Sequence, residues 1–333
     1  MMKPPAYWQN DPQKPGLIER LTSPLGDLYG DAVAKKLANT DGQRVAAPVI
    51  CVGNITMGGV GKTPFTAYLA AQLQEKGRKP AILMRGYGGR LKGPVAVTDI
   101  HRAADVGDEA LLLRRTAPVI VSADRPAGAA LAFDQGADVV VMDDGFQNPS
   151  LHKDLSFVVI DAKAGLGNQR VFPAGPLRER AVDGLARADA VLLIGDDGAE
   201  NAHRRFGIPL DKVVLTARLT TDVQSLNLNQ PVIAFAGIGR PEKFFDGLEA
   251  GGINVLSRHP FPDHHPYREA DIRRLIAEAK NAGATLVTTE KDAVRLPSIV
   301  QHEVIAVPAL LHLNDPEKLD PLLDQAIAQT KGP

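Results

Sequence analysis

A glycine-rich segment at residues 49–64, VICVGNITMGGVGKTP, has the composition of a loop that binds phosphate groups. An apolar run leads into it, and a helical pattern follows from Lys62 and Thr63. In such a loop, backbone N–H groups surround a phosphate, the lysine adds a positive charge, and the threonine hydroxyl can ligate Mg²⁺. The usual pattern has glycine where this chain has Thr56. We predict an ATP site rather than a turn that contains Gly-Lys-Thr by chance, and its residues are Thr56, Met57, Gly58, Gly59, Val60, Gly61, Lys62 and Thr63.

Two adjacent carboxylates, Asp143 and Asp144, come at the end of the apolar run 139–142. In a parallel sheet, a carboxylate at the carboxyl end of a strand faces the phosphate loop and can hold Mg²⁺. Two neighbouring negative charges are costly without a cation, which favours a metal over a solvent-exposed Asp-Asp-Gly turn. We therefore predict that Thr63, Asp143 and Asp144 bind the metal.

Arg85 and Tyr87 follow a second apolar run at residues 80–84, so they should lie on the same sheet edge as the phosphate loop. They are candidates for substrate contact, although a glycine-rich loop without a ligand explains the same residues. Asp108 begins a helical pattern, where the helix dipole favours a carboxylate with or without catalysis. The pair Arg178 and Glu179 could belong to a charged lid or to a solvated helix start.

A second group of titratable residues lies in the segment 261–267, FPDHHPY. Histidine changes its charge near neutral pH, so a loop histidine such as His264 can move a proton if it faces a cleft. An exposed histidine pair without a role is the alternative. The spacing of Asp263, His264 and His265 does not match the usual zinc ligand patterns.

Other nucleotide-binding proteins share a phosphate loop, and the sequence argues against two of them. A GTP switch carries Asn/Thr-Lys-x-Asp after a strand, but residues 289–292, TEKD, lack the required spacing. ATPases of the partitioning and metal-chaperone type carry a signature lysine where this chain has Met57. Such an ATPase and a kinase of a soluble metabolite are two alternatives that the phosphate loop leaves open.

Taken together, these motifs resemble the tetraacyldisaccharide 4′-kinase family in their order and approximate spacing. The matching segments are GNITMGGVGKTP at 53–64, RGYG at 85–88, VGDE at 106–109, DDGFQ at 143–147, PLRE at 176–179 and the Asp263-His264 loop. One departure is Asn148, where a histidine is expected after DDGFQ. This departure casts doubt on a role for that side chain here.

The resemblance implies an ATP- and Mg²⁺-dependent kinase that phosphorylates the 4′-hydroxyl of tetraacyldisaccharide 1-phosphate to give lipid IVA in lipid A biosynthesis. It also implies that Asp108 pairs with His264 to activate the hydroxyl, with Lys62 as the third catalytic residue. The enzyme would act as a monomer at the cytoplasmic face of the bacterial inner membrane. The residues that we then expect to contact the lipid disaccharide are Arg85, Tyr87, Gln147, Arg178 and Glu179.

Composition supports an intracellular globular protein. The 333 residues carry 38 Lys and Arg against 39 Asp and Glu, so no net positive charge attracts a nucleic acid. The single cysteine, Cys51, can form neither an internal disulfide nor a cysteine-rich zinc site, which fits a reducing compartment. No run approaches the roughly 18 apolar residues that a membrane-spanning helix needs.

The chain reads as two α/β domains preceded by a helical arm. Residues 1–44 contain a proline-rich extended arm and then, over 17–37, a kinked pair of amphipathic helices that either packs on the domain behind it or contacts a membrane. Residues 45–220 predict a P-loop kinase domain with a doubly wound, mostly parallel sheet. Residues 221–230 are a polar linker. Residues 231–333 form a smaller α/β domain whose last helix could pack back on the first.

Overall fold

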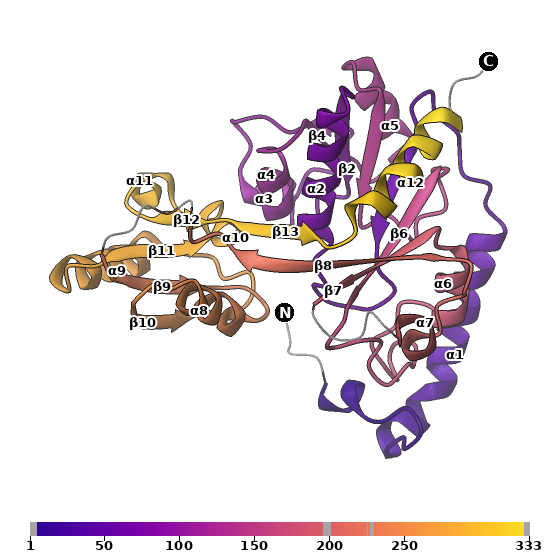
Figure 1. Cartoon of the computed structure of the whole chain (residues 1–333), viewed down its shortest axis with the longest axis horizontal. Helices are drawn as coiled ribbons and strands as arrows, with labels where there is room; N and C mark the ends of the chain where they lie inside the picture. Colours follow the sequence, from indigo (N-terminus) through magenta and orange to yellow (C-terminus); the bar gives the residue numbers. More distant parts are fainter. Residues whose placement is uncertain (1–4, 196–200, 225, 227–229, 330–333) are drawn as a thin grey trace.

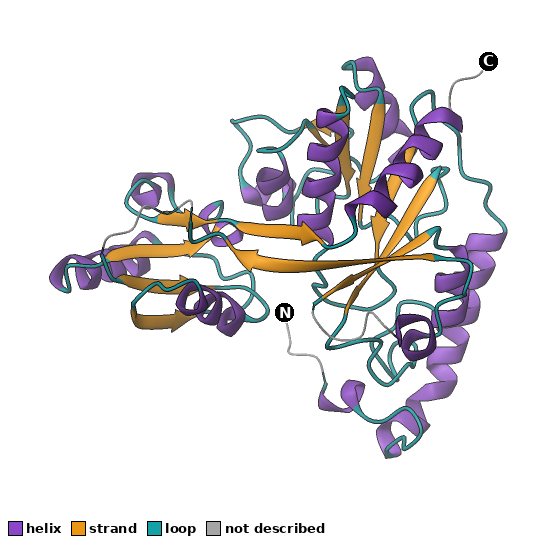
Figure 2. Ribbon diagram, in the orientation of Figure 1, coloured by secondary structure: helices purple, strands orange, loops and turns teal. Residues whose placement is uncertain are grey.

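The computed structural model describes residues 5–195, 201–224, 226 and 230–329. It contains a nine-stranded sheet in a larger lobe and a four-stranded sheet in a smaller lobe (Figure 1). Helices surround both sheets, as Figure 2 shows. The α/β fold class that the sequence predicts is confirmed.

The larger sheet has the strand order β13-β8-β7-β6-β1-β5-β2-β4-β3. Its neighbouring strands are parallel except for the β3–β4 and β13–β8 pairs. The central strand β1 pairs with β5 on one side and with β6 on the other. All of its residues are buried, as expected for a parallel strand that is covered on both faces. The strands are β1 (Val49–Gly53), β2 (Pro80–Met84), β3 (Val95–Ala96), β4 (Val119–Val121), β5 (Val139–Asp143), β6 (Leu155–Asp161), β7 (Ala190–Ile194), β8 (Val213–Thr221) and β13 (Ala309–Leu313).

Two apolar cores cover the two faces of this sheet. One core contains Phe65 and Leu69 from α2 together with Leu113 from α4 and Leu323 from α12. The other contains residues of α5, α6 and α7, which makes the sheet doubly wound. The helices are α2 (Lys62–Glu75), α3 (Ala103–Val106), α4 (Asp108–Leu113), α5 (Arg125–Asp134), α6 (Ala181–Arg187), α7 (Ala202–Phe206) and α12 (Pro316–Gln329).

The N-terminal arm differs from the prediction. Residues Ala6–Gln9 form a short 3-10 helix, η1, because Trp8 is buried and its indole N–H donates to Pro173 O at 3.4 Å. The expected kinked pair is one helix, α1 (Leu17–Ala38), which continues through Pro24. Contacts on both sides of the proline hold it: the buried Glu19 accepts hydrogen bonds from residues before the helix, and Gly26 packs on the 171–174 segment.

The sequence also missed two strands, β3 and β13. In β13, Leu311 pairs with Leu219 of β8 in antiparallel register, so two adjacent strands connect the lobes (Figure 1). The polar stretch interpreted as a linker begins inside β8, which ends at Thr221. Of that stretch, residues 225 and 227–229 lie outside the described part of the chain.

The smaller sheet is parallel and has the order β10-β9-β11-β12. Helix α8 packs on one face, where Phe245 and Leu248 meet Val232, and α9 packs on the other. Among the described residues, no helix is long and apolar enough to span a membrane. The elements of this lobe are β9 (Val232–Ala236), α8 (Pro241–Ala250), β10 (Val255–Pro260), α9 (Glu269–Asn281), β11 (Thr285–Thr289), α10 (Glu290–Ala293), α11 (Ser298–Gln301) and β12 (Ile305–Val307).

Candidate active site

The glycine-rich segment connects β1 to α2 as a tight turn with an open outer surface. Gly58 and Gly61 have φ angles of +114° and +95°, a region that side chains with a Cβ rarely adopt. A Cβ on Gly61 would also lie 2.5 Å from Ile194 Cδ1, whereas nothing lies within 4 Å of a Cβ on Gly58 or Gly59. The loop is therefore fixed on its inner side and leaves room for a ligand on its outer side.

Lys62 begins α2 and points back across this loop. Its Nζ donates to Asn54 Oδ1 at 3.1 Å and lies 3.5 Å from Asp144 Oδ1. Asn54 is fully buried and donates from Nδ2 to Thr56 O at 2.6 Å, so one amide side chain braces both the loop and the lysine. The sequence analysis overlooked Asn54, although an asparagine directly after a buried strand is a recognisable signal.

The two adjacent carboxylates occupy different environments. Asp143 is the last residue of β5; it is buried and accepts from Thr66 Oγ1 at 3.1 Å. Burial raises the pKa of its carboxyl to about 7. Asp144 is half-exposed, and its Oδ1 accepts from Arg178 at 2.8 Å. Burial opposes ionisation of Asp144 as well, but Lys62 and Arg178 lower its pKa below the ordinary value.

The 176–179 segment forms a wall of the phosphate loop. Met57 N donates to Pro176 O at 2.7 Å, and Arg178 N donates to Ile55 O at 2.8 Å. Gln147 Nε2 donates to both Asn54 O and Glu179 Oε1 at 2.8 Å. Gln147, Arg178 and Glu179 therefore lie together beside the loop.

Glu179 is the most enclosed of the candidate substrate residues. Its side chain is buried and also pairs with Arg187, with an Oε2–Nη1 distance of 2.7 Å. Arg187 in turn stacks on the Phe146 ring at 4.5 Å. Glu179 therefore helps to hold the side chains of Gln147 and Arg187 in the site.

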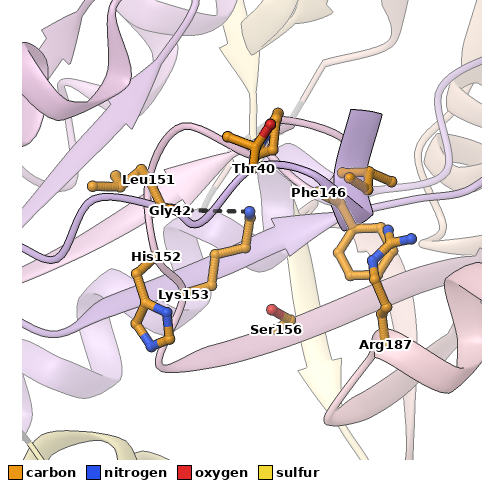
Figure 3. A pocket seen from close by; sticks show the side chains of 10 residues that line it. Thr40, Gly42, Phe146, Leu151, His152, Lys153, Ser156 and Arg187 are labelled. Atoms are coloured by element: carbon orange, nitrogen blue, oxygen red, sulfur yellow. Dashed lines mark hydrogen bonds between the residues drawn. The ribbon is translucent and has the colours of Figure 1, made fainter. Parts of the chain in front are cut away.

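A hollow of about 220 Å³ lies beside the loop that follows the two aspartates. Figure 3 shows Lys153, Ser156 and Arg187 around it, with Phe146 forming one side. Lys153 Nζ donates to Asn148 O at 2.6 Å and so holds the loop that follows the two aspartates. Asn148 Oδ1 accepts from Ser150 within that same loop.

Arg85 and Tyr87 lie in the loop after β2, and both side chains are exposed to solvent, Tyr87 at 70%. Their loop packs directly against the residues before Asp108. Gly107, with φ of +89°, allows this contact because a Cβ there would lie 2.4 Å from Tyr87 O. The two loops consequently share one edge of the larger sheet.

Asp108 and His264 come from different lobes and meet at this edge. His264 Nδ1 lies 2.9 Å from Asp108 Oδ2. Asp108 is the first residue of α4, and Arg295 Nε is 3.4 Å from the same oxygen. Burial favours the neutral acid, but the hydrogen bond to His264 and the charge of Arg295 lower the pKa of Asp108 below its ordinary value. Asp108 is therefore held as a carboxylate.

Comparison with known proteins decides between the alternatives that the motifs leave open. A family model described as "Tetraacyldisaccharide-1-P 4'-kinase" matches residues 18–328. The chain belongs to this family. The tetraacyldisaccharide 4′-kinase of Paramagnetospirillum magneticum is 49% identical to this family member over 328 residues, covering 97% of this chain and 98% of the relative. That of Rhodospirillum rubrum is 47% identical, covering 98% of each.

A solved structure supports the same assignment. The crystal structure of an "apo" form of LpxK from Aquifex aeolicus in complex with ATP matches this family member with a TM-score of 0.74 and 27% sequence identity. The match covers 93% of this chain and 100% of the solved one. The resemblance read from the sequence is confirmed over nearly the whole chain.

Proposed function

We propose that this member of the family transfers the γ-phosphoryl group of ATP to the 4′-hydroxyl of a tetraacyldisaccharide 1-phosphate. The single observation that carries this proposal is the Asp108–His264 contact, with a separation of 2.9 Å between atoms of different lobes. A carboxylate–histidine pair formed by two lobes can take the proton of an acceptor hydroxyl that binds between them. The names of the relatives supply the identity of the acceptor.

The phosphate loop supplies the charges that phosphoryl transfer requires. Backbone N–H groups of residues 56–63 and the ammonium group of Lys62 are placed to hold the β- and γ-phosphates. Arg178 lies 2.8 Å from Asp144 and adds a second cation at the same position. Such groups accelerate transfer mainly by orienting the phosphates and by stabilising negative charge.

The donor set fits Mg²⁺, which proteins usually bind through one or two carboxylates together with substrate phosphates. Asp143 is buried with a neutral hydroxyl as its hydrogen-bond partner, and burial raises its pKa to about 7, so a divalent cation would stabilise its charged form. We infer that Asp143 and the Thr63 hydroxyl hold the ion, while Asp144 stays with Lys62 and Arg178. When bound, Mg²⁺ would neutralise charge on the phosphates.

The Asp108–His264 pair is the proposed proton acceptor. As the 4′-oxygen bonds to the γ-phosphorus, the bond from that phosphorus to the β,γ-bridging oxygen breaks and ADP leaves. The hydroxyl proton passes to the pair, where the imidazole supports a carboxylate that would otherwise be a weak base. Arg85, Tyr87 and Gln147, on the same edge, are the candidates for contact with the disaccharide.

A direct assay tests this function. Purified protein, labelled ATP and tetraacyldisaccharide 1-phosphate in detergent should give a labelled lipid product on thin-layer chromatography, and the product should require both Mg²⁺ and the lipid. ATP turnover that is independent of added lipid would support the ATPase alternative. Transfer of label to a water-soluble acceptor would support the soluble-metabolite alternative.

A lipid acceptor that stays in the bilayer requires the enzyme to come to the membrane, and α1 offers a suitable face. One side of α1 packs on the protein through Gly26 and Gly30. The opposite side exposes a row of leucines, with exposed fractions of 73% at Leu17, 69% at Leu21, 59% at Leu25 and 68% at Leu28. We propose that a monomer contacts the cytoplasmic face of the inner membrane through this leucine row.

Replacing Leu21, Leu25 and Leu28 together by glutamate should remove most vesicle binding and leave ATP binding unchanged. Burial of each leucine contributes roughly 1.5–3 kcal/mol, so the loss should exceed a hundredfold in the partition coefficient. Co-sedimentation with phospholipid vesicles measures it. Leu210→Glu is the matched control, because Leu210 is more exposed still, at 88%, and is not part of α1. Equal partitioning of the triple variant and the wild type would refute the membrane role of α1.

A further inference from the structure

The TEKD segment at residues 289–292, which does not fit a guanine-binding motif, lies at the boundary between the two lobes. Thr289 ends β11, and Glu290–Ala293 form the short helix α10 directly after it. The Thr289 hydroxyl accepts from Asp292 N at 3.1 Å and caps this turn. Helix α10 packs against α4, the helix that Asp108 begins.

Arg295, two residues beyond α10, contacts Asp108 directly and the loop that carries His264 through backbone carbonyls. Its side chain is only 6% exposed, and Nε lies 3.4 Å from Asp108 Oδ2. Its Nη2 donates to Gly237 O at 3.0 Å, and the same carbonyl accepts from His264 N at 3.1 Å. Its Nη1 donates to His265 O at 3.3 Å. One guanidinium thus contacts the carboxylate of one lobe and the histidine loop of the other.

Asp292 fixes this guanidinium in place. It is fully buried, and its Oδ1 accepts from Arg295 Nη2 at 2.5 Å, from Tyr267 OH at 2.7 Å and from Gly237 N at 3.0 Å. An ion pair in such a buried place adds little stability, because removing both charges from water offsets their attraction. Its benefit is geometric, because Tyr267 OH and Gly237 N fix the carboxylate that Arg295 contacts.

The remaining residues of the segment form ion pairs with the larger lobe. Lys291 Nζ lies 3.4 Å from Glu109 Oε1, and Glu290 Oε1 lies 3.1 Å from Arg115 Nη1. The negative Glu290 thus faces a positive residue of the larger lobe, and the positive Lys291 faces a negative one. Charge-reversed or shifted docking of the two lobes would place like charges together.

From these contacts we infer that residues 289–295 form a clamp that positions the Asp108 carboxylate against His264. This inference rests on the proposed function, because it assigns a purpose to the same pair. Two strands, β8 and β13, connect the lobes, so a rotation about them would separate Asp108 from His264. A misplacement of about 1 Å in a reacting group can cost on the order of a hundredfold in rate. Arg295 is a positioning residue in this arrangement.

The decisive variant is Arg295→Met. We expect kcat to fall by about tenfold to a hundredfold while the KM for ATP stays unchanged, because the clamp is separate from the phosphate loop. The acid limb of the kcat–pH profile should move to higher pH. The groups that face Asp108 are His264, Arg295 and, more distantly, Lys291. Loss of the Arg295 charge raises the affinity of the Asp108–His264 pair for a proton.

Further variants separate positioning from a general structural effect. Arg295→Lys keeps the charge, so it should restore the acid limb and part of kcat. Arg274→Met, an exposed arginine of the same lobe, is the matched control and should behave as wild type. Arg295→Met with a wild-type kcat and pH profile would overturn the clamp. A lower kcat with an unmoved acid limb and no rescue by lysine would overturn it as well.

A charge swap at the edge of the clamp keeps the test valid if Arg295→Met does not fold. Glu290→Arg places a cation beside Arg115 and should lower kcat several-fold, whereas the double variant Arg115→Glu with Glu290→Arg should restore it. Failure of the double variant to recover activity would contradict the clamp. Wild-type protein that does not phosphorylate the lipid would refute the proposed function itself, whereas an active wild type with unaffected variants refutes only the clamp.

Discussion

Asp108→Ala and His264→Ala should each lower kcat by about 10²–10⁴-fold, the range that a general base contributes. Asp108 and His264 contact each other at 2.9 Å, whereas the lysine of the phosphate loop is held by Asn54 at 3.1 Å. The affinity for ATP should therefore stay nearly unchanged. Steady-state rates with saturating lipid give kcat, and equilibrium binding of a non-hydrolysable ATP analogue gives the affinity.

The double variant distinguishes one catalytic unit from two separate effects. If Asp108 and His264 act together through their hydrogen bond, removing both should cost about as much as removing one. Arg274→Met, whose side chain is exposed on the smaller lobe, controls for general damage. A loss of ATP affinity with an unchanged kcat in either single variant would rule out the role of the pair as the base.

The phosphate loop and the two aspartates can be predicted from the sequence because each depends on a continuous segment. A buried strand, a turn and a helix follow one another within residues 49–75. Glycines stand where the turn needs positive φ angles, so the sequence itself indicates the turn. Asp143 likewise ends its own strand. Local order along the chain therefore places Lys62 and Asp143 on the same sheet edge without knowledge of the tertiary fold.

The rest of the site depends on contacts between distant segments. Asp108 and His264 are separated by 156 positions, and in the sequence analysis only the family resemblance brought them together. Arg295 carries no local signal, since a single arginine after a short helix is an ordinary surface pattern. Strand β13 was missed for a related reason: all strands of the smaller sheet lie between β13 and its partner β8 in the sequence. Packing around Pro24 overrode the helix-breaking tendency that predicted a kink.

Asp143→Asn should abolish most kinase activity and yet stabilise the metal-free protein at pH 8. The pKa of Asp143 is about 7 in the fold, above its ordinary value of 3.8, so the folded protein holds this proton more tightly than the unfolded chain. Binding of this proton therefore stabilises the folded state at low pH. That contribution to the free energy of unfolding is lost as the pH rises from about 4 to 7. Asparagine removes the penalty of the buried charge, which from the pKa difference is on the order of 4 kcal/mol in the free energy of unfolding.

Asp144→Asn provides the matched control because the neighbouring carboxylate has the opposite pKa shift. The Asp144 carboxylate contacts Arg178 at 2.8 Å and Lys62 at 3.5 Å, so its loss should leave two cations close together and lower the stability at pH 8. Thermal unfolding in a chelating buffer at pH 8 and near pH 4 measures both variants. Most of the gain from Asp143→Asn should be lost near pH 4, where the wild-type carboxyl is protonated in the folded state and only partly ionised in the unfolded chain. A gain that is equal at both pH values would show that the buried charge of Asp143 is not its cause.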